Sequence, residues 1–277
     1  MTSLTLALLL LQTPASDSVA VFVGAGDIGD CGNAARTTAA LLDSIPGTVF
    51  TAGDNAYGSG TADQYASCYD PTWGRHKART RPTLGNHDYR TDRGAPTYQY
   101  FGALAGDSGR GYYSYDLAGW HIIALNSNLD LKPGSAEERW LRADLAAHPA
   151  RCTLAYWHHP LFSSGEHGNY APARPLWDAL YEAGADVVVS GHDHTYERFA
   201  PQTPAGRPDP ARGIREFVVG TGGAGLYQFM TLERNSEVRN NRTHGVLKLT
   251  LRAAGYDWEF VPAAGGKFRD KGSGECH

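Results

Sequence analysis

The chain has 277 residues, of which 42% are apolar and 19% charged, proportions that are typical of a globular protein and argue against disorder. Its 25 basic and 29 acidic side chains give a formal net charge of −4. Because no Lys or Arg run is present, nucleic acid is not an expected partner. The 33 glycines and 15 prolines indicate many turns and long connections.

The first segment, residues 1–16, has the pattern of a secretory signal peptide. An apolar run over residues 4–11 precedes small residues around Ala15, although the usual basic start is missing. The run is too short to cross a bilayer, and no other stretch is long and apolar enough, so no membrane association is expected. A first core strand is the alternative, but residues 19–23 fill that role better. We therefore predict a secreted or periplasmic protein with a single domain over 17–277.

Strands and helices are predicted to alternate along most of the chain. Strands are expected over 19–26, 48–53, within 80–88, over 152–159 and over 185–191; helices over 33–44, 135–148 and 173–184; and hairpins over 112–127 and near residues 254–255. The helix over 135–148 begins with a capping-box pattern, Ser135 followed three residues later by Glu138. Residues 200–213 are expected to form a surface loop.

Five of the predicted strands end in polar residues. These are Asp27; Asp54, Asn55 and Tyr57; Asn86, His87 and Asp88; His158 and His159; and His192 and His194. Each group alone has a simpler explanation, such as a turn stabilised by an Asp side chain, a helix cap or a packed tyrosine. Together they favour one shared site, because ligands of α/β sheets gather outside the carboxyl ends of the strands.

The donor types indicate metal binding. In an extended segment His192 and His194 would lie on the same side and face one point, whereas the alternative is a polar loop tip rich in histidine. Carboxylate, amide and neutral imidazole donors suit iron, zinc or manganese, and the lack of nearby cysteine argues against copper and iron–sulfur sites. Six or seven donors are too many for one tetrahedral zinc. Two ions about 3.5–4 Å apart that share a carboxylate are therefore expected.

The same groups carry a family resemblance. The pattern GDxG, GDxxY, GNHD/E, VxxH and GHxH appears at residues 26–29, 53–57, 85–88, 155–158 and 191–194. The chain thus resembles the calcineurin-like metallophosphoesterases, and among them the purple acid phosphatases, over residues 20 to about 200. One departure is Ala155, where valine is usual, which is expected to affect packing rather than chemistry. The resemblance implies an α/β fold: a four-layer α-β-β-α sandwich of mixed sheets, helices on both outer faces and the metal site at the strand carboxyl ends.

The resemblance also implies a role for each residue. The first metal would be held by Asp27, Tyr57 and His194, the second by Asn86, His158 and His192, and Asp54 would bridge them. His158 is preferred over His159 because the family pattern His-x-Pro is met at residues 158–160. His87 and His167 are the expected catalytic residues, as phosphate contacts or general acids. For Asp88, orientation of an imidazole and a solvated turn both stay open.

The implied activity is hydrolysis of phosphoric esters. The expected enzyme is an acid-phosphatase-type phosphomonoesterase that acts on small phosphorylated substrates with a dinuclear metal-bound hydroxide. The implied cofactors are Fe(III) and a divalent Zn, Mn or Fe ion. A phosphodiesterase, a nucleotide hydrolase and a non-catalytic metal-binding module are the alternatives, and the oligomeric state stays open.

The four cysteines fit an exported protein, and the lack of a C-x-x-C pattern argues against a zinc ribbon. Four cysteines allow three pairings. Cys31 and Cys68 each lie shortly after a predicted metal-binding loop, which favours a Cys31–Cys68 disulfide and leaves Cys152 to pair with Cys276. Free buried thiols are the alternative.

Overall fold

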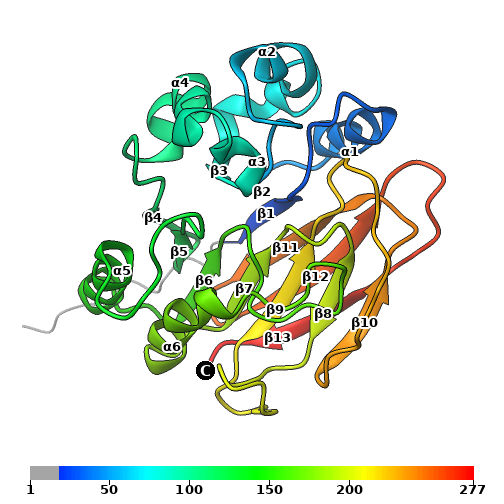
Figure 1. The fold of residues 1–277 in the computed structure, drawn as a ribbon. Helices are drawn as coiled ribbons and strands as arrows, with labels where there is room; N and C mark the ends of the chain where they lie inside the picture. Colours follow the sequence, from blue (N-terminus) through cyan, green and yellow to red (C-terminus); the bar gives the residue numbers. More distant parts are fainter. Residues whose placement is uncertain (1–18) are drawn as a thin grey trace, which may run out of the picture.

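A computed structural model describes residues 19–277, and the predicted signal segment 1–16 lies outside this range. Two mixed β-sheets pack between helices, as Figure 1 shows, so the predicted α-β-β-α sandwich is confirmed. The six-stranded sheet has the order β13 (Lys271–Glu275), β12 (Gly255–Pro262), β11 (Gly245–Arg252), β1 (Ala20–Ala25), β2 (Thr48–Ala52) and β3 (Thr80–Thr83). The seven-stranded sheet has the order β10 (Ser236–Asn240), β8 (Tyr196–Phe199), β9 (Arg215–Val219), β7 (Val187–Ser190), β6 (Cys152–Tyr156), β5 (Trp120–Ala124) and β4 (Tyr113–Leu117).

The helices lie mainly in the connections between these strands. The α-helices are α1 (Asn33–Ser44), α2 (Ala62–Gln64), α3 (Asn86–Tyr89), α4 (Ala95–Phe101), α5 (Ala136–Ala147) and α6 (Arg174–Glu182). Tighter or wider turns form η1 (Tyr65–Tyr69), η2 (Trp73–Arg79), η3 (Asp92–Gly94), η4 (Gly102–Ala105) and η5 (Ala171–Ala173). Between residues 19 and 277, none of the helices has the length and apolar character needed to span a membrane.

Parallel pairing brings the important strand ends together. In the first sheet β1, β2 and β3 run parallel, and in the second β5, β6, β7 and β9 do so. The strand β7 is buried along its whole length, as expected for a run of β-branched residues between two covered faces. Because parallel strands end at the same edge of their sheet, the loops after β1, β2, β3, β6 and β7 can form one site.

The structure also contains elements that the hydrophobic pattern did not predict. The strand β8 carries Glu197 and Arg198, which are unusual inside a sheet but are buried here with polar partners. Glu197 accepts hydrogen bonds from the backbone and hydroxyl of Ser164, and Arg198 pairs with Asp270. The predicted third strand is shorter than expected, because the chain turns into α3 directly after Gly85.

Both predicted disulfides are confirmed. Cys31 pairs with Cys68 across 37 residues of sequence, and Cys152 pairs with Cys276 across 124 residues. The first disulfide joins the segment after β1 to η1, and the second anchors the C-terminal segment to β6. In the chain-entropy model, cross-links of this span contribute about 3–5 kcal/mol each to stability.

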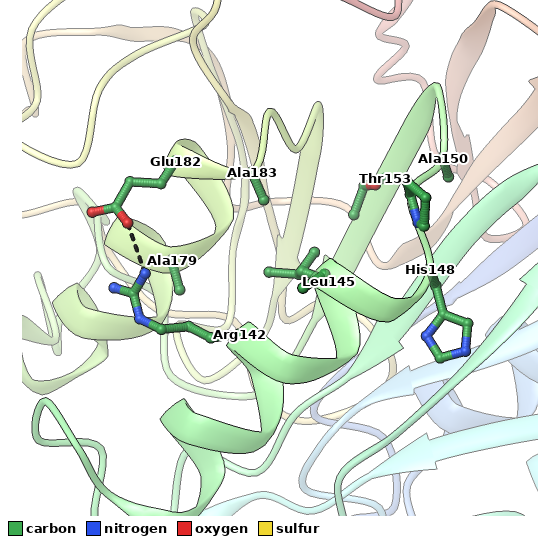
Figure 2. Close-up of a pocket in the computed structure, with 10 residues that line it drawn as sticks. Arg142, Leu145, His148, Ala150, Thr153, Ala179, Glu182 and Ala183 are labelled. Carbon is green, nitrogen blue, oxygen red and sulfur yellow. Dashed lines mark hydrogen bonds and ion pairs between the residues drawn. The ribbon is translucent and has the colours of Figure 1, made fainter.

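A cavity of about 390 Å³ lies between α5 and α6, with Arg142 paired to Glu182 at its edge (Figure 2). Ala150 and Thr153 line it at the start of β6, so it opens at the amino ends of the strands and is remote from the predicted site.

The capping box of α5 is only half formed. The Ser135 hydroxyl accepts from the Glu138 backbone, but the Glu138 carboxylate accepts from the Gly134 N–H instead of that of Ser135.

A buried imidazole near this end of the sheet is held between two carboxylates. His121 Nε2 lies 2.8 Å from Asp144 Oδ2, and its Nδ1 lies 3.1 Å from Asp116 Oδ1. Burial alone would lower the pKa of His121, but the hydrogen bonds and charges of Asp144 and Asp116 raise it above its usual value. Burial would likewise raise the pKa of Asp144, and the hydrogen bond from His121 lowers it.

We expect Asp144→Asn to reduce the free energy of unfolding by about 1.5–3 kcal/mol near pH 5.5, where His121 is protonated. A raised pKa in the folded state stabilises fully below the unfolded pKa of about 6.5 and is lost as pH rises through the folded value. The deficit of the variant should therefore shrink between pH 6.5 and pH 9 in urea unfolding. Asp116→Asn is the control, because Asp116 is 74% exposed and should matter less. If Asp144→Asn lowered the free energy of unfolding equally at pH 5.5 and pH 9, that result would contradict the ion pair between His121 and Asp144.

Candidate metal centre

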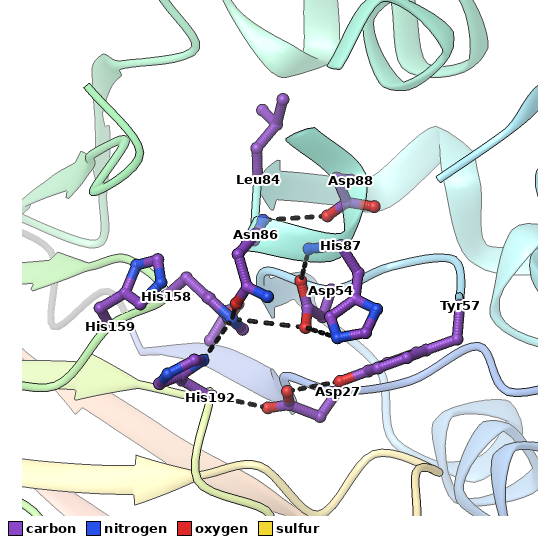
Figure 3. Close-up of polar contacts among 12 residues, drawn as sticks. Asp27, Asp54, Tyr57, Leu84, Asn86, His87, Asp88, His158, His159 and His192 are labelled. Atoms are coloured by element: carbon purple, nitrogen blue, oxygen red, sulfur yellow. Dashed lines mark hydrogen bonds and ion pairs between the residues drawn. The ribbon is translucent and has the colours of Figure 1, made fainter. Parts of the chain in front are cut away.

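The loops after five strands bring seven side chains together, and we call these side chains the polar cluster; Figure 3 labels all of them except His194. They are Asp27 after β1, Asp54 and Tyr57 after β2, Asn86 after β3, His158 after β6, and His192 and His194 after β7. Most are buried, and Tyr57, Asn86 and His192 are partly accessible. The residues that the sequence predicted for a metal site therefore lie at one place, and their role as ligands remains a proposal.

One part of the cluster contains Asp27, Tyr57 and His194. The Tyr57 hydroxyl lies 2.8 Å from Asp27 Oδ1 and 3.0 Å from His194 Nε2. His194 Nε2 is also 3.3 Å from Asp27 Oδ1. These three atoms form a compact triangle of oxygen and nitrogen donors.

The other part contains Asn86, His158 and His192. His158 Nε2 lies 3.0 Å from Asn86 Oδ1 and 3.2 Å from His192 Nδ1. Asp54 lies between the two parts, with its Oδ2 3.5 Å from His158 Nε2. Ligand atoms of Asp27, Asp54 and His158 all fall within 4.8 Å of one another. The seven side chains thus form two adjoining groups with Asp54 at their border.

Backbone contacts outside the cluster aim these donors inward. His158 Nδ1 lies 2.8 Å from Ala52 O, and His194 Nδ1 lies 2.7 Å from Gly225 O, so the opposite ring nitrogen of each histidine faces the cluster. Asp27 Oδ2 accepts from the His192 N–H at 2.8 Å, and Asp54 Oδ1 accepts from the His87 N–H at 2.8 Å. The second oxygen of each aspartate faces the other side chains of the cluster, Asp27 Oδ1 toward Tyr57 and Asp54 Oδ2 toward His158. Such outer contacts are typical of metal-binding residues.

The chemistry of the donor set fits metal ions. Asn86 Oδ1, Asp54 Oδ2 and His192 Nδ1 converge on His158 Nε2, and all are electron-rich atoms when the imidazoles are neutral. Burial would lower the pKa of His158, but the Asp54 carboxylate raises it to about 9. Burial would raise the pKa of Asp54, and His158 lowers it below its usual value. The cluster therefore needs positive charge at its centre, and carboxylate, amide and imidazole donors suit iron, zinc or manganese.

Three residues of the cluster have strained backbones. Asp27, Asp54 and His192 have φ values of 60°, 51° and 70°, in the left-handed region that non-glycine residues rarely adopt. Strain of this kind gathers at functional sites.

The expectation that His192 and His194 lie in an extended segment is wrong, because β7 ends at Ser190 and a turn follows. The turn sends the two imidazoles to different parts of the cluster.

Glycines in the motifs are required by close approach. A Cβ atom at Gly85 would lie 2.1 Å from Asp54 Oδ1, and one at Gly191 would lie 2.7 Å from Asp27 Oδ2. Any side chain at either position would displace a carboxylate of the cluster. This explains why Gly85 precedes Asn86 and Gly191 precedes His192.

Three further histidines border the cluster. His87 Nδ1 lies 2.8 Å from Gly58 O, and its Nε2 faces Asp54 Oδ2 at 3.9 Å. The exposed His167 stacks on His192 with ring centroids 4.3 Å apart. His159 is buried and lies 2.7 Å from the Ser127 hydroxyl, and burial, followed by the charge of His158, lowers its pKa to about 3. His87 and His167 are thus placed at the edge of the cluster, while their catalytic role remains a proposal.

Asp88 matches neither sequence-based alternative, because it is fully buried and contacts no imidazole. Its carboxylate accepts from the N–H groups of Gly85 and Asn55 at 2.9 and 3.1 Å and from the Tyr65 hydroxyl at 2.9 Å. Burial, with a contribution from the Asp54 charge, raises its pKa to about 6. Asp88 therefore ties the loop after β2 to the loop after β3. In the sequence, the signal for Asp88 was its position as the acidic last residue of the GNHD motif.

The sequence did not reveal two other residues of this region. Asp193 is buried and accepts from the backbone N–H groups of His167 and Gly168 at 2.8 and 3.2 Å, which holds the loop that carries His167. Tyr227 stacks on His194, with ring centroids 3.9 Å apart and planes 12° apart. It lies in an irregular segment without periodicity, so only the tertiary structure identifies it.

Comparisons with known proteins show which family the sequence resembles. The family model described as calcineurin-like phosphoesterase matches residues 16–196. Purple acid phosphatase 21 of Arabidopsis thaliana is 30% identical over 215 residues, covering 69% of this chain and 47% of that protein. Phosphoenolpyruvate phosphatase of Allium cepa is 30% identical over 202 residues, covering 62% and 40%. This chain therefore spans less than two thirds of the length of these relatives.

A solved structure supports the fold. The purple acid phosphatase PPD1 from yellow lupin, Lupinus luteus, superposes with a TM-score of 0.79 at 20% identity, over 94% of this chain and 54% of that one. At this identity the match establishes the shared sandwich architecture, in which the observed two sheets and flanking helices have their counterparts.

Proposed function

Because this chain belongs to the calcineurin-like phosphoesterase family, we propose that it is a metal-dependent phosphoric ester hydrolase of the purple acid phosphatase type. The observation that carries this proposal is the convergence of seven donors from five strand ends into two groups that adjoin at Asp54. Fold likeness alone would not suffice, since one fold hosts many functions. We propose phosphomonoesters as the substrates, because similarity to acid phosphatases points to them.

We propose that two metal ions occupy the polar cluster. Asp27, Tyr57 and His194 would hold one, which is Fe(III) if the Tyr57 oxygen binds as a phenolate. Asn86, His158 and His192 would hold a divalent Zn, Mn or Fe ion. Asp54 would bind both. When bound, such ions polarise phosphoryl oxygens and activate water near neutral pH.

The residues around the cluster would bind and protonate the substrate. His87 has its Nδ1 fixed by the Gly58 carbonyl, so its Nε2 points along the rim of the cluster toward Asp54. His167 stacks on His192 and is held through its backbone N–H by Asp193. The better-fixed imidazole is more suitable as a general acid, because proton transfer requires a defined position. We therefore assign the leaving-group proton to His87 and phosphate contact to His167.

We expect His87→Asn to slow hydrolysis of phenyl phosphate about 10²–10⁴-fold, the usual contribution of a general acid. Hydrolysis of p-nitrophenyl phosphate should slow much less, because p-nitrophenolate leaves almost without a proton. His167→Asn should slow both substrates alike. Steady-state kcat for the two substrates distinguishes the assignments, with the exposed and remote His148→Asn as control. The reverse pattern would transfer the acid role to His167.

Tyr57 tests whether the first ion is Fe(III). Burial and then the Asp27 charge raise the pKa of Tyr57 well above 10, so the phenol keeps its proton until a cation replaces it. Iron-loaded protein should be pink or purple, because a phenolate bound to Fe(III) absorbs visible light. Tyr57→Phe should lose that absorption and retain some hydrolysis, whereas Tyr227→Phe should keep the colour. Colourless wild-type protein that is fully active with zinc or manganese alone would contradict an Fe(III)–Tyr57 bond.

The proposed activity is tested with p-nitrophenyl phosphate and bis-p-nitrophenyl phosphate on the same preparation. We expect faster turnover of the monoester, loss of that turnover after removal of metals by a chelator, and its return when metals are added. If the protein hydrolysed the diester faster than the monoester, its assigned activity would change from phosphomonoesterase to phosphodiesterase. No turnover of either substrate by metal-loaded protein would leave a non-catalytic metal-binding module.

A further inference from the structure

An unpaired arginine is anchored beside the polar cluster. Arg90 Nη1 donates to the Gly58 carbonyl at 2.8 Å, and the same oxygen lies 2.8 Å from His87 Nδ1. The Arg90 side chain is therefore next to the imidazole whose Nε2 faces Asp54. Arg90 is exposed, and within residues 19–277 no carboxylate forms an ion pair with it. A guanidinium has five N–H donors in a fixed fork, so most of its donors stay available.

An exposed carboxylate lies next to His167, the other accessible histidine that borders the cluster. His167, which stacks on His192, follows the exposed Glu166 directly in the sequence. An anionic group on a substrate would therefore be attracted toward Arg90 and repelled from Glu166.

We propose that Arg90 forms a subsite for a second anionic group, a carboxylate or a further phosphate, carried by the leaving group of the substrate. This inference rests on the proposed function and specifies the substrate class of the same site. Gly58 holds one edge of the guanidinium, which pre-positions the remaining N–H groups for two-point contact with an oxyanion. The leaving group then extends past His87, on the side where its proton is supplied. A lysine could neutralise the anion but would not reproduce the forked contact.

The test compares phenyl phosphate with 2-carboxyphenyl phosphate, and includes pyrophosphate to distinguish a carboxylate from a second phosphate. For 2-carboxyphenyl phosphate and for pyrophosphate, whose leaving groups carry a further anionic group, kcat/KM is divided by kcat/KM for phenyl phosphate. Dividing the wild-type ratio by the Arg90→Ala ratio cancels the intrinsic reactivity of each substrate. We expect this quotient to be about 10, mostly through KM, as for one hydrogen-bonded charge contact. Arg90→Lys should recover part of the loss.

The control is Arg151→Ala, which removes the same charge from an exposed position just before β6, at the opposite edge of the sheet. Its quotient should stay near 1. A quotient near 1 for Arg90→Ala, or an equal loss on all three substrates, would overturn the subsite and leave Arg90 as a support for the Gly58 loop. Wild-type protein that hydrolyses none of the three substrates would instead overturn the proposed function itself.

Discussion

Asp54→Ala is expected to abolish phosphoester hydrolysis and to lower the metal content at both positions. Asp54 lies at the border of the two donor groups, with Oδ2 3.5 Å from His158 Nε2 and Oδ1 fixed by the His87 N–H. A ligand shared by two ions cannot be lost from one of them alone. The loss of activity should exceed the roughly 10²–10³-fold cost of removing one donor that stabilises a transition state.

Elemental analysis and kcat on p-nitrophenyl phosphate measure both effects in the same sample. Asp54→Asn keeps the shape of the side chain and covers the case in which the alanine variant folds poorly. Asp30→Ala serves as control, because Asp30 is an exposed carboxylate in the loop after β1 that caps a local turn. Two ions per chain together with substantial activity in folded Asp54→Asn would contradict a bridging role.

Asp88→Asn is expected to have the second-largest effect, although Asp88 is not expected to touch a metal or the substrate. Its carboxylate accepts from Gly85, Asn55 and Tyr65, and an asparagine would direct an NH₂ group at one of these donors. Breaking a buried charged network typically costs about 3–5 kcal/mol. Because the two loops it joins carry Asp54 and Asn86, metal affinity should also fall about 10–100-fold, as for other residues that orient ligands.

Urea unfolding and competition with a chromogenic chelator measure these two losses. The matched control is Asp92→Asn, an exposed aspartate four residues later that should be nearly neutral. Metal affinity that stays unchanged in a destabilised Asp88→Asn protein would show that Asp88 supports the fold without positioning the ligands.

The sequence predicted the parts of the site that depend on local pattern. Apolar runs located β1, β2, β6 and β7, and the polar residues that follow them could be assigned to one edge because parallel strands end together. The cysteine pairing followed from the position of Cys31 and Cys68 beside two of these loops. Such inferences need only short stretches of chain and one rule of sheet topology.

Features that depend on distant partners were not predictable in the same way. An aspartate directly after a strand is typical of a solvated turn, so the sequence alone did not reveal a structural role for Asp88. Its burial against Asn55 and Tyr65 gives it that role. The strand β8 was missed because Glu197 and Arg198 are polar, and their partners Ser164 and Asp270 lie far away in sequence. The left-handed backbone of His192 contradicts the extended geometry that the preceding valines suggested.

Titration of metal-free protein with iron and zinc measures whether the polar cluster holds a dinuclear centre. Phosphatase activity on p-nitrophenyl phosphate should rise with added metal and reach its plateau at two equivalents per chain, because both donor groups must be filled. Activity that is complete at one equivalent, or that persists in protein freed of metal, would contradict the dinuclear account.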